Sequence, residues 1–93
     1  EILIGLVGSE MCKETAVHVL VIPKEHICCA DAVNEENVGN IAHIFTKIPE
    51  ITKSLGLTNG YRIVNNCGED GCQSVKHMHF HILGGKKLNG TMA

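Results

Sequence analysis

Three histidines alternate with apolar residues near the carboxyl end of the chain, in the segment KHMHFHILGG. If this segment is a β-strand, His77, His79 and His81 point to one face, with about 6.7 Å between successive histidines. The opposite face would be the core face and would carry Met78, Phe80 and Ile82. Packing explains a single buried histidine, but it does not explain a row of three on one face. The spacing therefore predicts chemistry carried out by imidazoles.

A row of neutral imidazoles can do either of two kinds of chemistry. The unperturbed pKa of imidazole is about 6.5, so the neutral ring is a nucleophile near pH 7, and mutual repulsion discourages full protonation of neighbouring rings. One ring could attack a phosphorus atom while a neighbour donates to a non-bridging oxygen, which gives a covalent adduct on nitrogen. The alternative is a zinc site. The nearby thiols and carboxylates lack a familiar ligand spacing, so we expect no metal and no other cofactor.

The residues just before the histidines predict a polar loop. Asn65 to Gln73 is rich in polar residues and contains Gly68 and Gly71, and the hydroxyl of Ser74 follows directly. A loop of this kind can turn several backbone N–H groups towards one anion, although most such loops are simply turns. Its position next to the histidines favours the anion-binding interpretation.

Apolar runs predict the strands that must position these side chains. We expect strands over Ile2 to Val7, His18 to Ile22, Tyr61 to Val64 and Ser74 to Leu83, and Pro23 should end the second of them. The polar residues 9–15 predict a loop.

A helix is predicted between the second and third strands. Asn34 is its expected N-cap, and the apolar stripe consists of Val38, Ile41, Phe45 and Ile48. Pro49 should end or kink this helix, and a second helical piece should run from there to Gly56 with Ile51 and Leu55 facing inward. Strands, a helix and then strands predict an α+β fold with an antiparallel sheet and a long helix.

Composition narrows the class of protein. The 93 residues are 44% apolar and 19% charged, which predicts a single globular domain over residues 1–93. A net charge of −2 argues against binding to nucleic acid, and no apolar stretch approaches the length of a membrane span. The five cysteines are an odd number without a regular framework, which favours reduced thiols and a cytoplasmic location.

Two segments, HVLVIPKEHI and GYRIVNNCGEDGCQSVKHMHFHILGG, resemble the histidine-triad nucleotide-binding (Hint) branch of the histidine-triad (HIT) superfamily. With the helix between them, the resemblance covers about residues 16–86 and implies a HIT-like fold. It also implies homodimers that share a sheet and bind purine nucleotides. Members of this branch hydrolyse nucleoside phosphoramidates and aminoacyl adenylate-like bonds at the α-phosphorus, and they need no metal to do so.

The resemblance also assigns roles to residues. It makes His79 the nucleophile, His81 the contact to phosphate oxygens and His77 the residue that orients the nucleophile, while His26 supports the triad and Ser74 lies near the leaving group. The nucleotide-binding candidates are Asn66, Cys72, Gln73, Ser74, His79 and His81. His18 and His43 receive no catalytic role.

The chain departs from the family pattern in three places. Residues 1–15 do not match, and no aspartate precedes His18 to contact the ribose hydroxyls. Cys72 stands where the family has glycine, and it could pair with Cys67. Pro49 falls where the family helix continues, and the tail over residues 87–93 has no tryptophan. These departures keep two alternatives open: a non-catalytic or weakly active nucleotide-binding or scaffold dimer, and a zinc-binding module.

Overall fold

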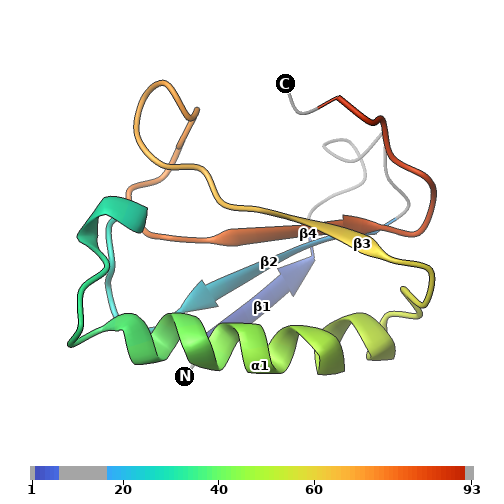
Figure 1. Ribbon diagram of the computed structural model, residues 1–93, viewed down its shortest axis with the longest axis horizontal. Helices are drawn as coiled ribbons and strands as arrows, with labels where there is room; N and C mark the ends of the chain where they lie inside the picture. The colour runs from blue at the N-terminus through green and yellow to red at the C-terminus, as the bar shows by residue number, and fades with distance from the viewer. Residues whose placement is uncertain (1, 7–16, 92–93) are drawn as a thin grey trace.

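A long helix packs along one face of an antiparallel sheet (Figure 1). The computed structural model describes residues 2–6 and 17–91, so the predicted loop over residues 9–15 and Cys12 lie outside the described residues. The described elements are β1 (Ile2–Leu6), β2 (Val17–Pro23), a short 3-10 helix (Ala30–Ala32), α1 (Val38–Ser54), β3 (Tyr61–Val64) and β4 (Phe80–Gly84). This is the α+β fold with an antiparallel sheet and a long helix that the sequence predicts.

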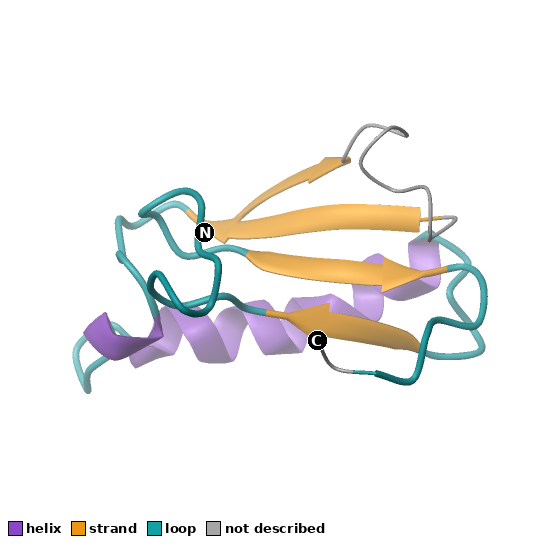
Figure 2. Ribbon diagram, turned by 90° about the horizontal axis from the view of Figure 1, so that it is seen from above, coloured by secondary structure: helices purple, strands orange, loops and turns teal. Residues whose placement is uncertain are grey.

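The strands of the described residues lie in the order β1-β2-β4-β3, and each pairs antiparallel with its neighbour. Seen from above, the strands lie over α1 (Figure 2). β4 is central because His81 lies beside Leu20 of β2 on one side and Val64 of β3 on the other. β1 and β3 are the edges of the described sheet.

The core lies between the sheet and α1, and it is almost entirely aliphatic. Met78, Phe80 and Ile82 are buried there, as the alternating pattern predicts. The sheet contributes Val19 and Val21 from β2 to the same layer. Since side chains alternate between the faces of a strand, the neighbouring histidines are turned to the opposite face, away from α1. Burial of the apolar set therefore fixes which face presents the imidazoles.

The last strand is shorter than predicted. The sequence predicts a strand over Ser74 to Leu83, whereas β4 begins at Phe80 and includes Gly84. β3 ends at Val64, which pairs with His81, so the residues before Phe80 have no partner in β3. Their backbone carbonyl and amide groups form hydrogen bonds with other residues. The side-chain amide of Asn65 donates to the carbonyl of His79 at 2.8 Å, and the amide of Met78 donates to the carbonyl of Ile27. The alternation of buried and half-buried residues nevertheless continues back to residue 77.

The apolar face of α1 differs from the predicted stripe. Val38 and Phe45 are 46% and 50% exposed, so the prediction that they face the core is wrong. The buried side chains are those of Ile44, Ile48, Ile51 and Thr52. Ile48 belongs to both stripes, so the buried face is rotated by less than the roughly 100° that separates adjacent residues around a helix axis. Phe45 still touches the core edge, because its ring meets that of Phe80 edge-on with 5.8 Å between the centroids.

The helix begins later and ends later than predicted. Asn37 precedes the first helical residue, while Asn34 closes the turn before it, its side-chain oxygen accepting from the amides of Glu36 and Asn37. Pro49 lies inside α1 without ending it, so the two predicted helical pieces are one helix. Pro49 is exposed, which places the carbonyl that loses its amide partner on the solvent side. Gly56, with φ of 77°, follows the C-cap Leu55, as the sequence predicts.

No helix in residues 2–6 and 17–91 is long and apolar enough to cross a membrane.

Candidate functional site

A cavity of about 320 Å³ opens on the face of the sheet that is turned away from α1. The three histidines of the alternating segment line it, together with Ser74, which confirms that the triad shares one face. The complete lining is His18, Leu20, Ile22, Ser74, Val75, His77, His79 and His81. The lining combines aliphatic side chains with four imidazoles and the hydroxyl of Ser74. None of these lining residues is acidic, so no fixed negative charge in the wall opposes an anion.

Backbone carbonyls hold the rings of His77 and His79. Nδ1 of His79 lies 2.8 Å from the carbonyl oxygen of His77, and Nε2 of His77 lies 2.9 Å from that of Pro23. A carbonyl oxygen only accepts, so each of these ring nitrogens carries the proton and donates it. The neutral ring of His79 therefore keeps its lone pair on Nε2. This tautomer leaves a nucleophilic nitrogen on the far side of the ring from the hydrogen bond.

The fourth imidazole in the cavity belongs to His18. Its Nε2 lies 2.8 Å from Nδ1 of His81, and the two ring centroids are 5.1 Å apart. The sequence alone gives His18 no role, because nothing in the local pattern shows which strand lies beside β4. The pairing of β2 with β4 brings them together, since it sets His18 opposite Leu83, two residues beyond His81. The available signal was that His18, Leu20 and Ile22 share one face of β2.

Both partners of this pair are held towards the neutral form. Burial lowers the pKa of His18 below the usual value. Burial is also the largest cause that lowers the pKa of His81, and the charges that His18 and His79 would carry lower it further. At neutral pH the His18–His81 contact is thus a hydrogen bond between two uncharged rings. One of the two facing nitrogens donates and the other accepts.

His26 lies just outside the cavity. Its ring meets the ring of His77 edge-on, with 5.0 Å between the centroids, although its side chain is exposed. The structure therefore joins His26 to the triad through His77 and not through His79. His43 lies elsewhere: it is on α1 and, with Ile2 and Ile4, borders a different hollow beside β1.

The remaining candidates lie in the loop that precedes the histidines and do not line the cavity. The side-chain amide of Asn66 donates to the carbonyl of Gly71, which closes the loop on itself. The side chain of Gln73 donates to the carbonyls of Cys28 and Val75 and accepts from the amide of Gly68. These contacts tie the loop to the segment that enters the cavity.

Cys72, in the same loop, has φ of 63°. Among residues 2–6 and 17–91, Cys72 is the only residue other than glycine with a positive φ. A side chain at such a φ costs about 1–2 kcal/mol relative to glycine. A glycine at this position would be unstrained.

A zinc site would need at least three ligand side chains close together, and the part of the chain that the structure describes has no such group. No three or more of the described histidine, cysteine, aspartate and glutamate side chains lie so that they could hold one metal ion. The four described cysteines, Cys28, Cys29, Cys67 and Cys72, are free thiols.

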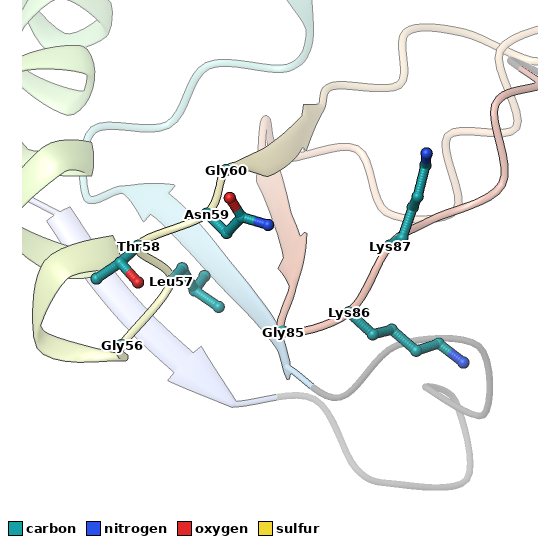
Figure 3. A pocket seen from close by; sticks show the side chains of 8 residues that line it. All are labelled: Gly56, Leu57, Thr58, Asn59, Gly60, Gly85, Lys86 and Lys87. Atoms are coloured by element: carbon teal, nitrogen blue, oxygen red, sulfur yellow. The ribbon is translucent and has the colours of Figure 1, made fainter.

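A cavity of about 410 Å³ lies where β4 ends and β3 begins (Figure 3). The segment from Gly56 to Gly60 and the residues Gly85, Lys86 and Lys87 line it. The two lysine side chains point in different directions, so their charges do not converge on one ligand. The cavity with the imidazoles is the better candidate, because its reactive groups face a common space.

Solved structures with the same fold share substantial sequence with this chain. A histidine triad protein from Clostridium difficile is 41% identical, with a TM-score of 0.78 over 83% of this chain and 68% of the other. A HIT family hydrolase from Legionella pneumophila is 31% identical, with a TM-score of 0.87 over 99% of this chain and 80% of the other.

Sequence comparison gives the same family. An uncharacterised HIT-like protein of Rickettsia prowazekii is 46% identical over 78 residues, which are 82% of this chain and 65% of that protein. A HIT-like protein of Buchnera aphidicola is 42% identical over 76 residues, or 78% of this chain and 66% of that protein. The chain thus spans just under two thirds of the length of these curated relatives. The sequence model of the HIT domain matches residues 11–88, and the chain therefore belongs to the HIT domain family.

Proposed function

We propose that this chain is a Hint-like nucleotide-binding hydrolase that cleaves purine nucleoside phosphoramidates or related adenylates at the α-phosphorus. The observation that carries the proposal is the tautomer of His79, whose Nδ1 donates to the carbonyl of His77 and whose Nε2 keeps its lone pair. The name "HIT family hydrolase", which the related Legionella protein carries, supports the same reaction class.

The reaction would proceed in two displacements. In the first, Nε2 of His79 attacks the α-phosphorus, the bond from phosphorus to the leaving amine breaks, and the amine departs with a proton taken up from the site. Ser74 lines the same cavity, and its hydroxyl would assist this departure. In the second displacement, water attacks phosphorus, the bond from phosphorus to Nε2 breaks, and the nucleoside monophosphate is released with His79 restored.

His81 would stabilise the negative charge that develops on the phosphate oxygens. If His18 donates from Nε2 to Nδ1 of His81, the proton of the neutral His81 ring sits on Nε2, where it can be donated to an oxygen. Preorganised donors of this kind act at the transition state without reorganising. His18 is therefore a positioning residue for His81, and His26 holds a similar relation to His77 through their edge-on contact.

The aliphatic wall of the cavity suits the rest of a nucleotide. Leu20, Ile22 and Val75 line the same cavity as the imidazoles and present an apolar surface to a ligand. Ligand pockets commonly combine such a wall with a few polar groups that fix orientation. We assign the base or sugar to this wall and the phosphate to the histidines. Asn66, Cys72 and Gln73 would contribute through the loop that positions Ser74.

The direct test is to replace His79 with alanine and to assay hydrolysis of an adenosine phosphoramidate. Turnover should fall by orders of magnitude, because the two-step route needs the nucleophile. His43→Ala is the matched control, since His43 is a half-buried histidine outside the cavity, and it should hydrolyse like the parent chain. Unchanged turnover in His79→Ala would contradict the proposal. Calorimetry with a purine mononucleotide distinguishes the alternative of a non-catalytic binding or scaffold dimer, which would bind without hydrolysis.

We also propose that the protein is a cytoplasmic homodimer whose subunits share a sheet. β1 and β3 are the edges of the described sheet, and an edge strand has backbone groups available to pair with a second copy. Sedimentation analysis at micromolar concentration should give twice the mass of the chain, whereas a monomer would contradict this part of the proposal.

A further inference from the structure

Two cysteines lie at the two ends of one tight turn in the loop before the histidines. Cys67 is half-buried and Cys72 is exposed, and both are free thiols. The loop between them doubles back, because the amide of Cys72 donates to the carbonyl of Glu69 at 3.0 Å and the amide of Gln73 donates to that of Gly68 at 3.0 Å. The two displacements proposed for the hydrolysis do not involve either thiol.

The turn brings the backbone next to Cys72 directly against that of Cys67. A Cβ added to Gly71 would collide with the carbonyl oxygen of Cys67 and would lie 3.0 Å from its amide nitrogen. Gly71 thus packs against Cys67 without room for a side chain. Its carbonyl is held there by the side-chain amide of Asn66, at 2.6 Å. The backbone of Cys72, the next residue, therefore lies close to that of Cys67.

The backbone of Cys72 is an independent sign that the thiol has a use. Its φ of 63° lies in the left-handed region, where a glycine would be unstrained. Gly68 in the same loop has φ of 75° and is a glycine, so the loop uses glycine where it needs this conformation elsewhere. A strained residue that persists in a functional loop points to a role for its side chain.

We propose that Cys67 and Cys72 form a reversible disulfide when the protein meets a hydroperoxide, and that this disulfide switches the site off. The exposed Cys72 thiolate attacks the peroxide and becomes a sulfenic acid, with release of water after protonation. The Cys67 thiolate then displaces the hydroxyl group from that sulfur, which forms the S–S bond and releases a second water. Overall, two thiols are oxidised to one disulfide and one hydrogen peroxide is reduced to two waters.

The loop transmits this change to the cavity. Gln73 follows Cys72 directly, and its side chain holds the carbonyl of Val75, which lines the cavity. Closing a disulfide one residue before Gln73 changes the backbone that sets this contact, so Ser74 and Val75 shift relative to the histidines. The effect on turnover rests on the hydrolase function proposed above, whereas the disulfide itself does not.

Peptide mapping tests the disulfide without any assay of activity. The full chain is treated with hydrogen peroxide, remaining thiols are alkylated, and the chain is digested with trypsin without reduction. Cleavage after Arg62 and Lys76 leaves Cys67 and Cys72 in one peptide and Cys28 and Cys29 in another. The peptide over residues 63–76 should lose two hydrogens and resist alkylation, and dithiothreitol should reverse both changes. Separate alkylation of the two thiols, or a link from either to Cys28, would overturn the proposal.

Hydrolysis is then measured on the same samples. Peroxide should remove turnover from the parent chain, and dithiothreitol should restore it. Cys67→Ser should keep its turnover in peroxide, while the matched control Cys29→Ser should lose it like the parent. A disulfide that leaves turnover unchanged would overturn the switch. A reduced parent chain without turnover would instead contradict the hydrolase proposal, and the mapping result would still stand.

Discussion

At the scale of single residues, the chemistry depends on which nitrogen of each ring carries a proton. Backbone carbonyls settle this for His77 and His79, because a carbonyl can only accept. The contact of His18 with His81 is different, since either ring can donate. The account assigns the donor to His18, which leaves the outer nitrogen of His81 protonated and able to bind a phosphate oxygen.

This assignment predicts the effect of removing His18. His18→Ala should lower kcat by about tenfold, the loss expected from one hydrogen bond of about 1.4 kcal/mol, with little change in KM. His18→Gln, whose amide nitrogen lies about where Nε2 of histidine lies and can still donate, should recover part of the loss. Steady-state kinetics check both variants, with His43→Ala as the control. An effect on KM alone, or no rescue by glutamine, would show that His18 does not orient His81.

At the scale of elements, α1 packs against the apolar face of the sheet. The burial of each α1 side chain determines how much its substitution lowers the free energy of unfolding. Ile48 is 2% exposed, whereas Val38 is 46% exposed. Ile48→Ala should therefore lower the free energy of unfolding by about 2–5 kcal/mol, and Val38→Ala should change it by about 0.5 kcal/mol or less. Urea denaturation of both variants measures this difference. Similar losses for the two would mean that the helix is rotated relative to the described packing.

The sequence predicts the existence and type of each described element better than its limits. Tyr61 to Val64 is a strand as predicted, because its apolar run stands between turn residues. Helix periodicity alone could not choose between a stripe through Phe45 and one through Ile44, because both residues are apolar and adjacent. Only packing against β2 and β4 decides which of them is buried. The prediction of two helical pieces meeting at Pro49 is wrong for a related reason, since the effect of a proline depends on whether its side of the helix is exposed.

The sequence predicts the parts of the candidate site that lie within one segment, but not the contacts between segments that are far apart in the sequence. Alternation along one segment is enough to place His77, His79 and His81 on one face. His18 enters the cavity only through the pairing of β2 with β4, a contact across 63 positions of sequence that no local pattern encodes. Gln73 illustrates the same limit, since its side chain holds the distant carbonyl of Cys28 and does not line the cavity.

At the scale of the whole molecule, the site makes stability depend on pH. The pKa values of His18 and His81 are lowered in the folded chain, mainly by burial, so below about pH 6.5 the unfolded chain binds more protons than the folded one. Stability should therefore be greatest above that pH and should fall as the pH drops through the lowered folded values. Urea unfolding between about pH 7.5 and 5.5 measures the slope, which should flatten in the double variant His18→Asn, His81→Asn. An equal slope in both proteins would contradict this assignment.

The whole account depends on a covalent bond between His79 and the α-phosphorus. Rapid mixing of the chain with an adenosine phosphoramidate, quenching on the millisecond scale and intact mass spectrometry measure this bond directly. We expect a transient mass increase equal to an adenylyl group, located on the peptide that contains His79 and absent from His79→Ala. Full single-turnover hydrolysis by the parent chain with no adduct at any time, or an adduct on another residue, would contradict it.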